Sequence, residues 1–82
     1  MALPVAIEIR QRWERHTRYY EAYLHQDLWG HWVLTRVWGG RGQATGQVRH
    51  RPCPSYEAGI EDLEQVGHRR RQRGYTQVSL GP

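Results

Sequence analysis

The sequence contains no lysine, only one cysteine and no long apolar run. With the single cysteine, Cys53, the chain cannot form an internal disulfide, which agrees with a reducing compartment. No stretch approaches the roughly 20 apolar residues that a membrane-spanning helix needs. The first residues, MALPVAIEIRQ, lack the basic head and long apolar segment of a signal peptide. We therefore expect a soluble, cytoplasmic protein that does not contact a membrane.

Recognisable motifs for metals, cofactors and catalysis are also missing. The five histidines are scattered along the chain, and His50 with Cys53 supplies at most two neighbouring ligands where zinc usually takes four. The residues between them give these two side chains no reason to meet as base and nucleophile. The sequence has neither a Walker motif nor a dinucleotide-binding fingerprint. We expect no metal, no cofactor and no enzymatic activity.

Arginine is what the chain has in excess, in a sequence of 82 residues with a formal net charge of +4. A domain this small buries only about 60 to 65 % of its unfolded surface, which leaves little room for a deep catalytic cavity. The planar guanidinium can donate two hydrogen bonds to one phosphate. The arginines form two clusters in the sequence, Arg36, Arg41, Arg49 and Arg51, and Arg69, Arg70, Arg71 and Arg73. Binding at the surface is therefore the favoured class of function.

Alternation of apolar and polar residues, with many β-branched and aromatic side chains, predicts strands at 5–13, 18–26 and 31–38. The segments 18–26 and 31–38 are expected to pair as a hairpin. A short fourth strand is predicted at 47–51 and ends at Pro52, because proline cannot donate to a sheet ladder. A last strand is predicted at 75–80.

A single helix is predicted between about residues 55 and 73, with Ser55 as a favourable N-cap and Gly74 at its end. Apolar residues recur at helical spacing on one face, namely Tyr56, Ile60, Leu63 and Val66. Acids near its start and arginines near its end complement the helix dipole, so this charge separation alone identifies no ligand. Together the elements predict an α+β fold, one domain over residues 1–82 with an antiparallel sheet of four to five strands and one long helix packed on it.

The order of these elements and five short strings resemble the WGR domain family. The strings are YYEAYL, WVLTRVWGGRG, GQ at residues 46–47, SYEAGIEDLEQV and RGY at residues 73–75. The signature strand and loop would then occupy residues 31–47. The family is known beside the catalytic part of DNA-damage-responsive poly(ADP-ribose) polymerases, where it binds DNA ends, and as small stand-alone bacterial proteins. The resemblance implies nucleic-acid binding rather than catalysis.

The sequence departs from the family at the motif itself. The family pattern is Trp-Gly-Arg, whereas this chain has Trp38, Gly39 and Gly40, with Arg41 one position late. In the polymerases the Trp packs near the terminal nucleotide and the Arg reaches DNA or a neighbouring domain. Either Arg41 takes the place of the missing arginine, since glycines on both sides give the segment freedom, or the site is weakened because adjacent residues often point apart.

The glycine-rich segment after Trp38 is the candidate binding site. An exposed Trp ring offers a stacking face, and glycine amides can donate to a phosphate without side chains in the way. The alternative is a plain turn with Trp38 in the core, as expected for Trp13, Trp29 and Trp32. Further candidates are Arg36, two residues before Trp38 on one strand face, Arg49 across the loop, and Tyr75, whose match in the polymerases lies near the bound 5′ end.

Two functions follow from these features. The first is binding of nucleic acid, DNA rather than RNA, at the backbone or at strand ends and without strong sequence specificity, because no helix is positioned to enter a major groove. The second is a protein-interaction module in a DNA-processing or ADP-ribosylation-related assembly, to which the acidic first half of the helix is suited. Backbone binding weakens steeply with salt, whereas an apolar protein interface does not.

Overall fold

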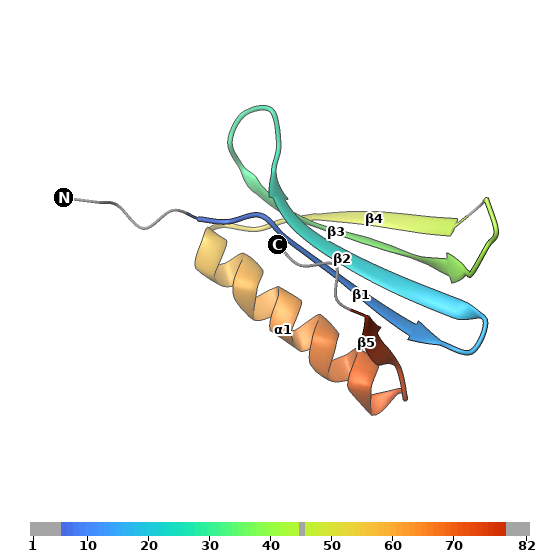
Figure 1. Ribbon diagram of the computed structural model, residues 1–82. Helices are drawn as coiled ribbons and strands as arrows, with labels where there is room; N and C mark the ends of the chain where they lie inside the picture. The colour runs from blue at the N-terminus through green and yellow to red at the C-terminus, as the bar shows by residue number, and fades with distance from the viewer. Residues whose placement is uncertain (1–5, 45, 79–82) are drawn as a thin grey trace.

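The computed structural model describes residues 6–44 and 46–78, which form five strands and one helix (Figure 1). In chain order these are β1 (Ile9–Arg15), β2 (Arg18–Gln26), β3 (Trp32–Gly40), β4 (Gly46–Pro52), α1 (Tyr56–Gln72) and β5 (Thr76–Val78). All strand pairs are antiparallel and the strand order is β4-β3-β2-β1-β5. Helix α1 runs from one edge strand to the other across one face of this sheet. The predicted α+β fold is confirmed.

The first strand differs from the predicted segment 5–13. It begins at Ile9, whose partner in β2 is Leu24, and it continues past the predicted end to Arg15. Ile7, which the alternation placed on the core face, is 53 % exposed, and Val5 lies outside the described residues. The ladder between β1 and β2 stops at the pair Ile9–Leu24, and beyond it the Gln26 N–H donates to the Glu8 carboxylate at 2.9 Å. β2 and β3 do pair as the predicted hairpin.

The core lies between α1 and the sheet face that the helix covers. Trp13 of β1, Leu24 of β2 and Leu34 of β3 are fully buried there, because they lie on the same face of three neighbouring strands. Trp32 is partly buried against the same core, as expected. The expectation for Trp29 is wrong, because this residue is 79 % exposed in the loop between β2 and β3.

Both predicted ends of the helix are confirmed. The Ser55 side chain caps α1 by accepting a hydrogen bond from the Ala58 N–H at 3.1 Å. Gly74, with φ of 82°, follows the C-cap residue Arg73 and donates its N–H to the Arg71 carbonyl. Within the described ranges, no helix has the length and apolar character needed to cross a membrane.

Two glycines on the buried face of α1 set how closely the helix approaches the sheet. A methyl group built on Gly59 would lie 2.5 Å from Leu24 Cδ1, whereas one built on Gly67 would meet its nearest neighbours, Trp13 Cζ2 among them, at 3.4 Å. We expect Gly59→Ala to lower the free energy of unfolding, since overpacking costs about 1 to 3 kcal/mol against a helix gain of about 1 kcal/mol. Gly67→Ala, in contrast, should be neutral or stabilising by up to about 1 kcal/mol.

Chemical denaturation of the two variants and the parent measures both effects. Because each substitution removes one helical glycine and adds one methyl group, the propensity change is the same in both. Equal stability of the two variants would contradict the close approach at Gly59.

Candidate nucleic-acid interface

The predicted glycine-rich loop is shorter than the sequence indicates, because β3 extends through Gly40 and β4 begins at Gly46. In the described part of this segment only Gly42 has a positive φ, 77°. Gly46 is needed for a different reason, since a methyl group there would lie 2.8 Å from Tyr19 Oη and 2.9 Å from the Trp38 carbonyl oxygen. The main effect of these glycines is therefore to let the ends of β3 and β4 approach closely, rather than to allow unusual backbone conformations.

A groove opens beside this strand end, and we name it the loop groove. Its lining is Thr17, Arg18, Trp38, Gly39, Gly40, Arg41, Gln43, Gly46 and Gln47. Trp38 is partly buried, and its ring stacks on Tyr20 with centroids 5.7 Å apart and planes at 13°. One ring face is thus supported by a rigid neighbour while part of the residue lines the groove. Trp38 belongs neither wholly to the core nor wholly to a turn.

Arg36 and Arg49 lie on the sheet face that α1 covers. They are direct partners across β3 and β4, so their side chains leave the sheet on the same side. Arg36 lies two residues before Trp38 in β3, and its Nη1 donates to Tyr20 Oη at 3.4 Å, so it contacts the Trp38–Tyr20 stack. Arg49 is exposed. Both remain candidates for contacts to phosphate, with Tyr20 as a link that the sequence analysis did not single out.

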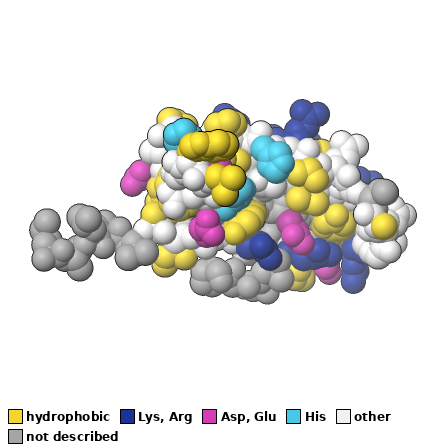
Figure 2. Space-filling model, turned by 90° about the horizontal axis from the view of Figure 1, so that it is seen from above, with side chains coloured by type: hydrophobic (Ala, Val, Ile, Leu, Met, Phe, Trp, Pro, Cys, Tyr) yellow, Lys and Arg dark blue, Asp and Glu magenta, His cyan; other side chains and the backbone are white. Residues whose placement is uncertain are grey.

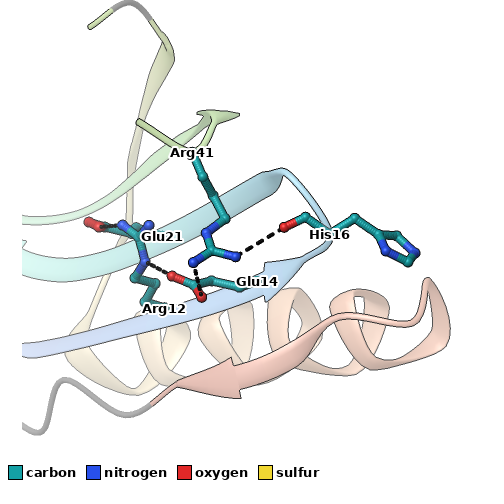
Figure 3. Close-up of polar contacts among 5 residues, drawn as sticks. All are labelled: Arg12, Glu14, His16, Glu21 and Arg41. Carbon is teal, nitrogen blue, oxygen red and sulfur yellow. Dashed lines mark hydrogen bonds and ion pairs between the residues drawn. The ribbon is translucent and has the colours of Figure 1, made fainter. Parts of the chain in front are cut away.

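Arg41 lines the loop groove, and its side chain also crosses to the β1–β2 turn (Figure 3). Its backbone N–H donates to the Thr17 carbonyl at 2.6 Å and its Nη1 to the His16 carbonyl at 3.1 Å. Its Nη2 lies 3.6 Å from Glu14 Oε1. Glu14 also accepts from Arg12, so the guanidinium of Arg41 joins a charge network on the uncovered sheet face. These contacts are those of a residue that fastens two turns together.

Arg70, which the sequence analysis did not single out, links Tyr75 to the residues around Trp38. The Tyr75 N–H donates to the Arg70 carbonyl at 3.0 Å, and the Arg70 guanidinium lies 5.2 Å from the Tyr75 ring. The same guanidinium lies 4.2 Å from the Tyr20 ring, which stacks on Trp38. Tyr75 and Trp38 are therefore connected through Arg70 and Tyr20. The sequence did contain a signal for Arg70, because this residue follows Leu63 by seven positions and therefore lies on the same face of the helix.

A second groove, which we name the arginine groove, lies between α1 and the strands β3 and β4. Its lining is Tyr20, Leu34, Arg36, Arg51, Asp62, Gln65, Val66, Arg69 and Arg70. The two arginine clusters that the sequence separates by some 20 positions meet here, Arg36 and Arg51 from one cluster and Arg69 and Arg70 from the other. Packing of the helix on the sheet produces this convergence, and no local pattern could have predicted it.

The structure brings two of the scattered histidines close together. Thr35 Oγ1 lies 2.7 Å from His25 Nε2 and 2.8 Å from His50 Nδ1, so one threonine brings two histidines together on the uncovered sheet face. Cys53 is buried, and burial raises the pKa of its thiol, which donates to the Arg51 carbonyl at 3.6 Å. Across residues 6–44 and 46–78 no three His, Cys, Asp or Glu side chains gather as metal ligands.

An exposed apolar pair stands at the loop between β2 and β3. Leu28 is 95 % exposed and Trp29 79 % exposed. Asp27 holds this loop in shape by accepting from the N–H groups of His31 and Trp29, each at 2.9 Å, and these bonds hold the pKa of Asp27 below its usual range. In the view of Figure 2, hydrophobic side chains stand out among histidine and charged side chains.

The structure is that of a small α+β domain with two grooves, whose linings contain arginines and aromatic side chains. The sequence matches the WGR domain over residues 4–82, and the chain belongs to this family. WGR domains are small binding domains and not catalytic ones. Searches of curated proteins and of solved structures each found no match.

Proposed function

We propose that this WGR domain binds nucleic acid, DNA rather than RNA, at the phosphate backbone and preferentially at strand ends, in the cytoplasm. The supporting observation is that Trp38, held on Tyr20, lines a groove together with glycines and the two arginines Arg18 and Arg41. A supported indole suits stacking on a terminal base or ribose, which is worth about 1 to 3 kcal/mol per base. Gly39 and Gly40 add no side chains of their own to the groove that they line, and Arg36, Arg49 and Tyr75 extend the surface. Family membership is consistent with this function.

Helix α1 takes no part in reading bases in this proposal. Its inner face is buried against the sheet, with Leu63 and Gly59 packed on core residues. The candidate residues lie on β3, on β4 and in the segments after β3 and α1, not on the exposed face of the helix, so the expected contacts are to phosphate, sugar and stacked rings. The binding is therefore expected to be weak and tolerant of sequence, with dissociation constants of roughly 10⁻⁴ to 10⁻⁶ M for short duplexes.

A comparison of circular and linear DNA tests the preference for ends. We expect a linear duplex to bind more tightly than a covalently closed circle of the same sequence and length, because only the linear form exposes a terminal base pair to Trp38. Fluorescence titration of both forms with the parent and with Trp38→Ala measures the difference. The Trp38→Ala variant should lose the preference while it keeps backbone binding. Equal affinity of the parent for circle and linear duplex would remove the strand-end part of the proposal.

A protein-interaction module is the second candidate, and the exposed pair Leu28 and Trp29 favours it. Large exposed apolar side chains that lie together often mark a binding surface for another protein. The partner would belong to a DNA-processing or ADP-ribosylation-related assembly. Salt separates the two functions, since backbone binding loses affinity with a logarithmic slope of about −0.9 per phosphate contact on duplex DNA, whereas an apolar interface changes little.

A further inference from the structure

The arginine groove is a second cavity beside the loop groove, and it shares Arg36 with the surface of the proposed function. It is a cavity of about 210 Å³ between α1 and the β3–β4 edge, with Tyr20 and Leu34 among its lining residues. This volume suits a compact group and not a whole base with its sugar. Tyr20 lines the arginine groove and Trp38 the loop groove, so the stacked pair separates the two sites.

Arg70 is a buried charged residue of this groove, and the rest of the fold does not explain its burial. It is only 9 % exposed, and its Nε atom, which is sealed from water, has no hydrogen-bond acceptor among the described residues. No acidic side chain of the described ranges lies within ion-pair distance of it. The rings of Tyr20 and Tyr75 near its guanidinium compensate part of the cost of burying a cation. A buried charge normally has an ionic partner as well, because desolvation is expensive.

The lining of the arginine groove has more positive than negative side chains. Arg36, Arg51 and Arg69 join Arg70 in the lining, and Asp62 is the one acidic side chain there. Asp62 already pairs with Arg51, with 3.5 Å between Oδ2 and Nε. Four positive charges and one negative charge leave the lining with a net charge of +3. An anion that can accept several hydrogen bonds is the chemical complement of such a lining.

We propose that the arginine groove binds a phosphate group against the guanidinium groups of Arg70, Arg36 and Arg69. Phosphate fits because its oxygens can accept from several planar guanidinium groups at once and its charge balances the excess of the lining. The group is either free phosphate or a phosphate of a nucleic-acid strand. This inference does not require that the loop groove bind nucleic acid.

The Arg70 side-chain Nε–H resonance in ¹H–¹⁵N spectra of the full chain reports directly on this site. Titration with inorganic phosphate should shift this resonance and saturate at roughly millimolar concentration, as two or three charged hydrogen bonds predict. Sodium chloride and sodium acetate at matched ionic strength should leave it in place. If phosphate moves the resonance no more than chloride, Arg70 is a structural residue held by the tyrosine rings, and the proposal fails. An equal response to acetate would also overturn the assignment to phosphate.

Charge-removing variants separate the groove from general electrostatics. Arg36→Gln and Arg69→Gln should each weaken phosphate binding by about tenfold or more, the loss of one charged hydrogen bond. Arg71→Gln is the matched control, because Arg71 is exposed, adjoins Arg70 in sequence and does not line the groove. It removes the same charge and should change the affinity less than threefold. Equal losses in all three variants would show only a diffuse basic surface. These variants also keep the test valid if replacement of buried Arg70 itself prevents folding.

A single-stranded oligonucleotide without terminal phosphates distinguishes the two sources of the group. If a strand phosphate occupies the groove, the oligonucleotide will shift the Arg70 resonance and compete with inorganic phosphate. If the groove takes free phosphate only, the oligonucleotide will leave Arg70 unchanged. The Trp38→Ala variant distinguishes failure of the phosphate site from failure of nucleic-acid binding at the loop groove. It should abolish stacking in the loop groove and retain the response of Arg70 to inorganic phosphate.

Discussion

Replacement of Leu63 with alanine will lower the free energy of unfolding by about 2 to 5 kcal/mol, the usual cost of a buried leucine-to-alanine change. Leu63 is 4 % exposed and belongs to the core cluster between α1 and the sheet. The fully buried Trp13, Leu24 and Leu34 give this core little freedom to collapse around a cavity. In a domain of 82 residues such a loss is a large share of a total stability that is typically about 5 to 15 kcal/mol.

Glu64→Ala is the control for this measurement. Glu64 is the next residue of the same helix and is exposed, so its loss should change the free energy of unfolding by less than about 0.5 kcal/mol. Urea denaturation followed by tryptophan fluorescence measures both variants. Comparable losses would contradict the orientation of α1 on the sheet.

The largest expected effect on binding comes from Gly40→Arg, which restores the family's Trp-Gly-Arg pattern. Gly40 is the last residue of β3 and lines the loop groove beside Trp38. Its φ is not in the positive range, and the three atoms nearest to a methyl group built there all belong to the side chain of Gln43, the closest at 2.8 Å, so this exposed side chain must move aside. An arginine is therefore tolerated, and one new charged hydrogen bond should raise affinity for DNA by about 1.5 to 3 kcal/mol. The salt slope should steepen by about one phosphate contact.

Ala44→Arg and Arg41→Ala are the controls for this gain. Ala44 is exposed in the same loop, so Ala44→Arg adds the same charge away from the groove and should raise affinity much less. Arg41 also lines the groove, but Glu14 and the His16 carbonyl hold its guanidinium, so Arg41→Ala should lower affinity by less than Gly40→Arg raises it. Thermal denaturation of each variant confirms folding. If folded Gly40→Arg binds as the parent does while Arg41→Ala loses affinity tenfold, Arg41 and not position 40 supplies the contact.

Most of the fold could be predicted because its elements carry local signals. The strand 18–26 and its pairing with β3 followed from alternation, and the ends of α1 followed from Ser55 and Gly74. The start of β1 and the exposure of Trp29 did not, because each depends on where a strand finds a partner. The candidate site was predicted only in part. The sequence singled out Trp38, Arg36 and Tyr75, whereas Tyr20 and Arg70, which connect them, belong to positions that periodicity assigns to the core.

Composition, periodicity and capping residues were sufficient for a small basic α+β domain with its helix and strands in order, and the resemblance of five short strings indicated the WGR family. Three features were decided only by the tertiary structure. These are the attachment of Arg41 to the β1–β2 turn, the burial of Arg70 between aromatic rings, and the meeting of two distant arginine clusters in one groove. The physical reason is that the direction of a long side chain is set by which neighbours bury its stem and accept its hydrogen bonds. Those neighbours come from segments that the sequence keeps far apart.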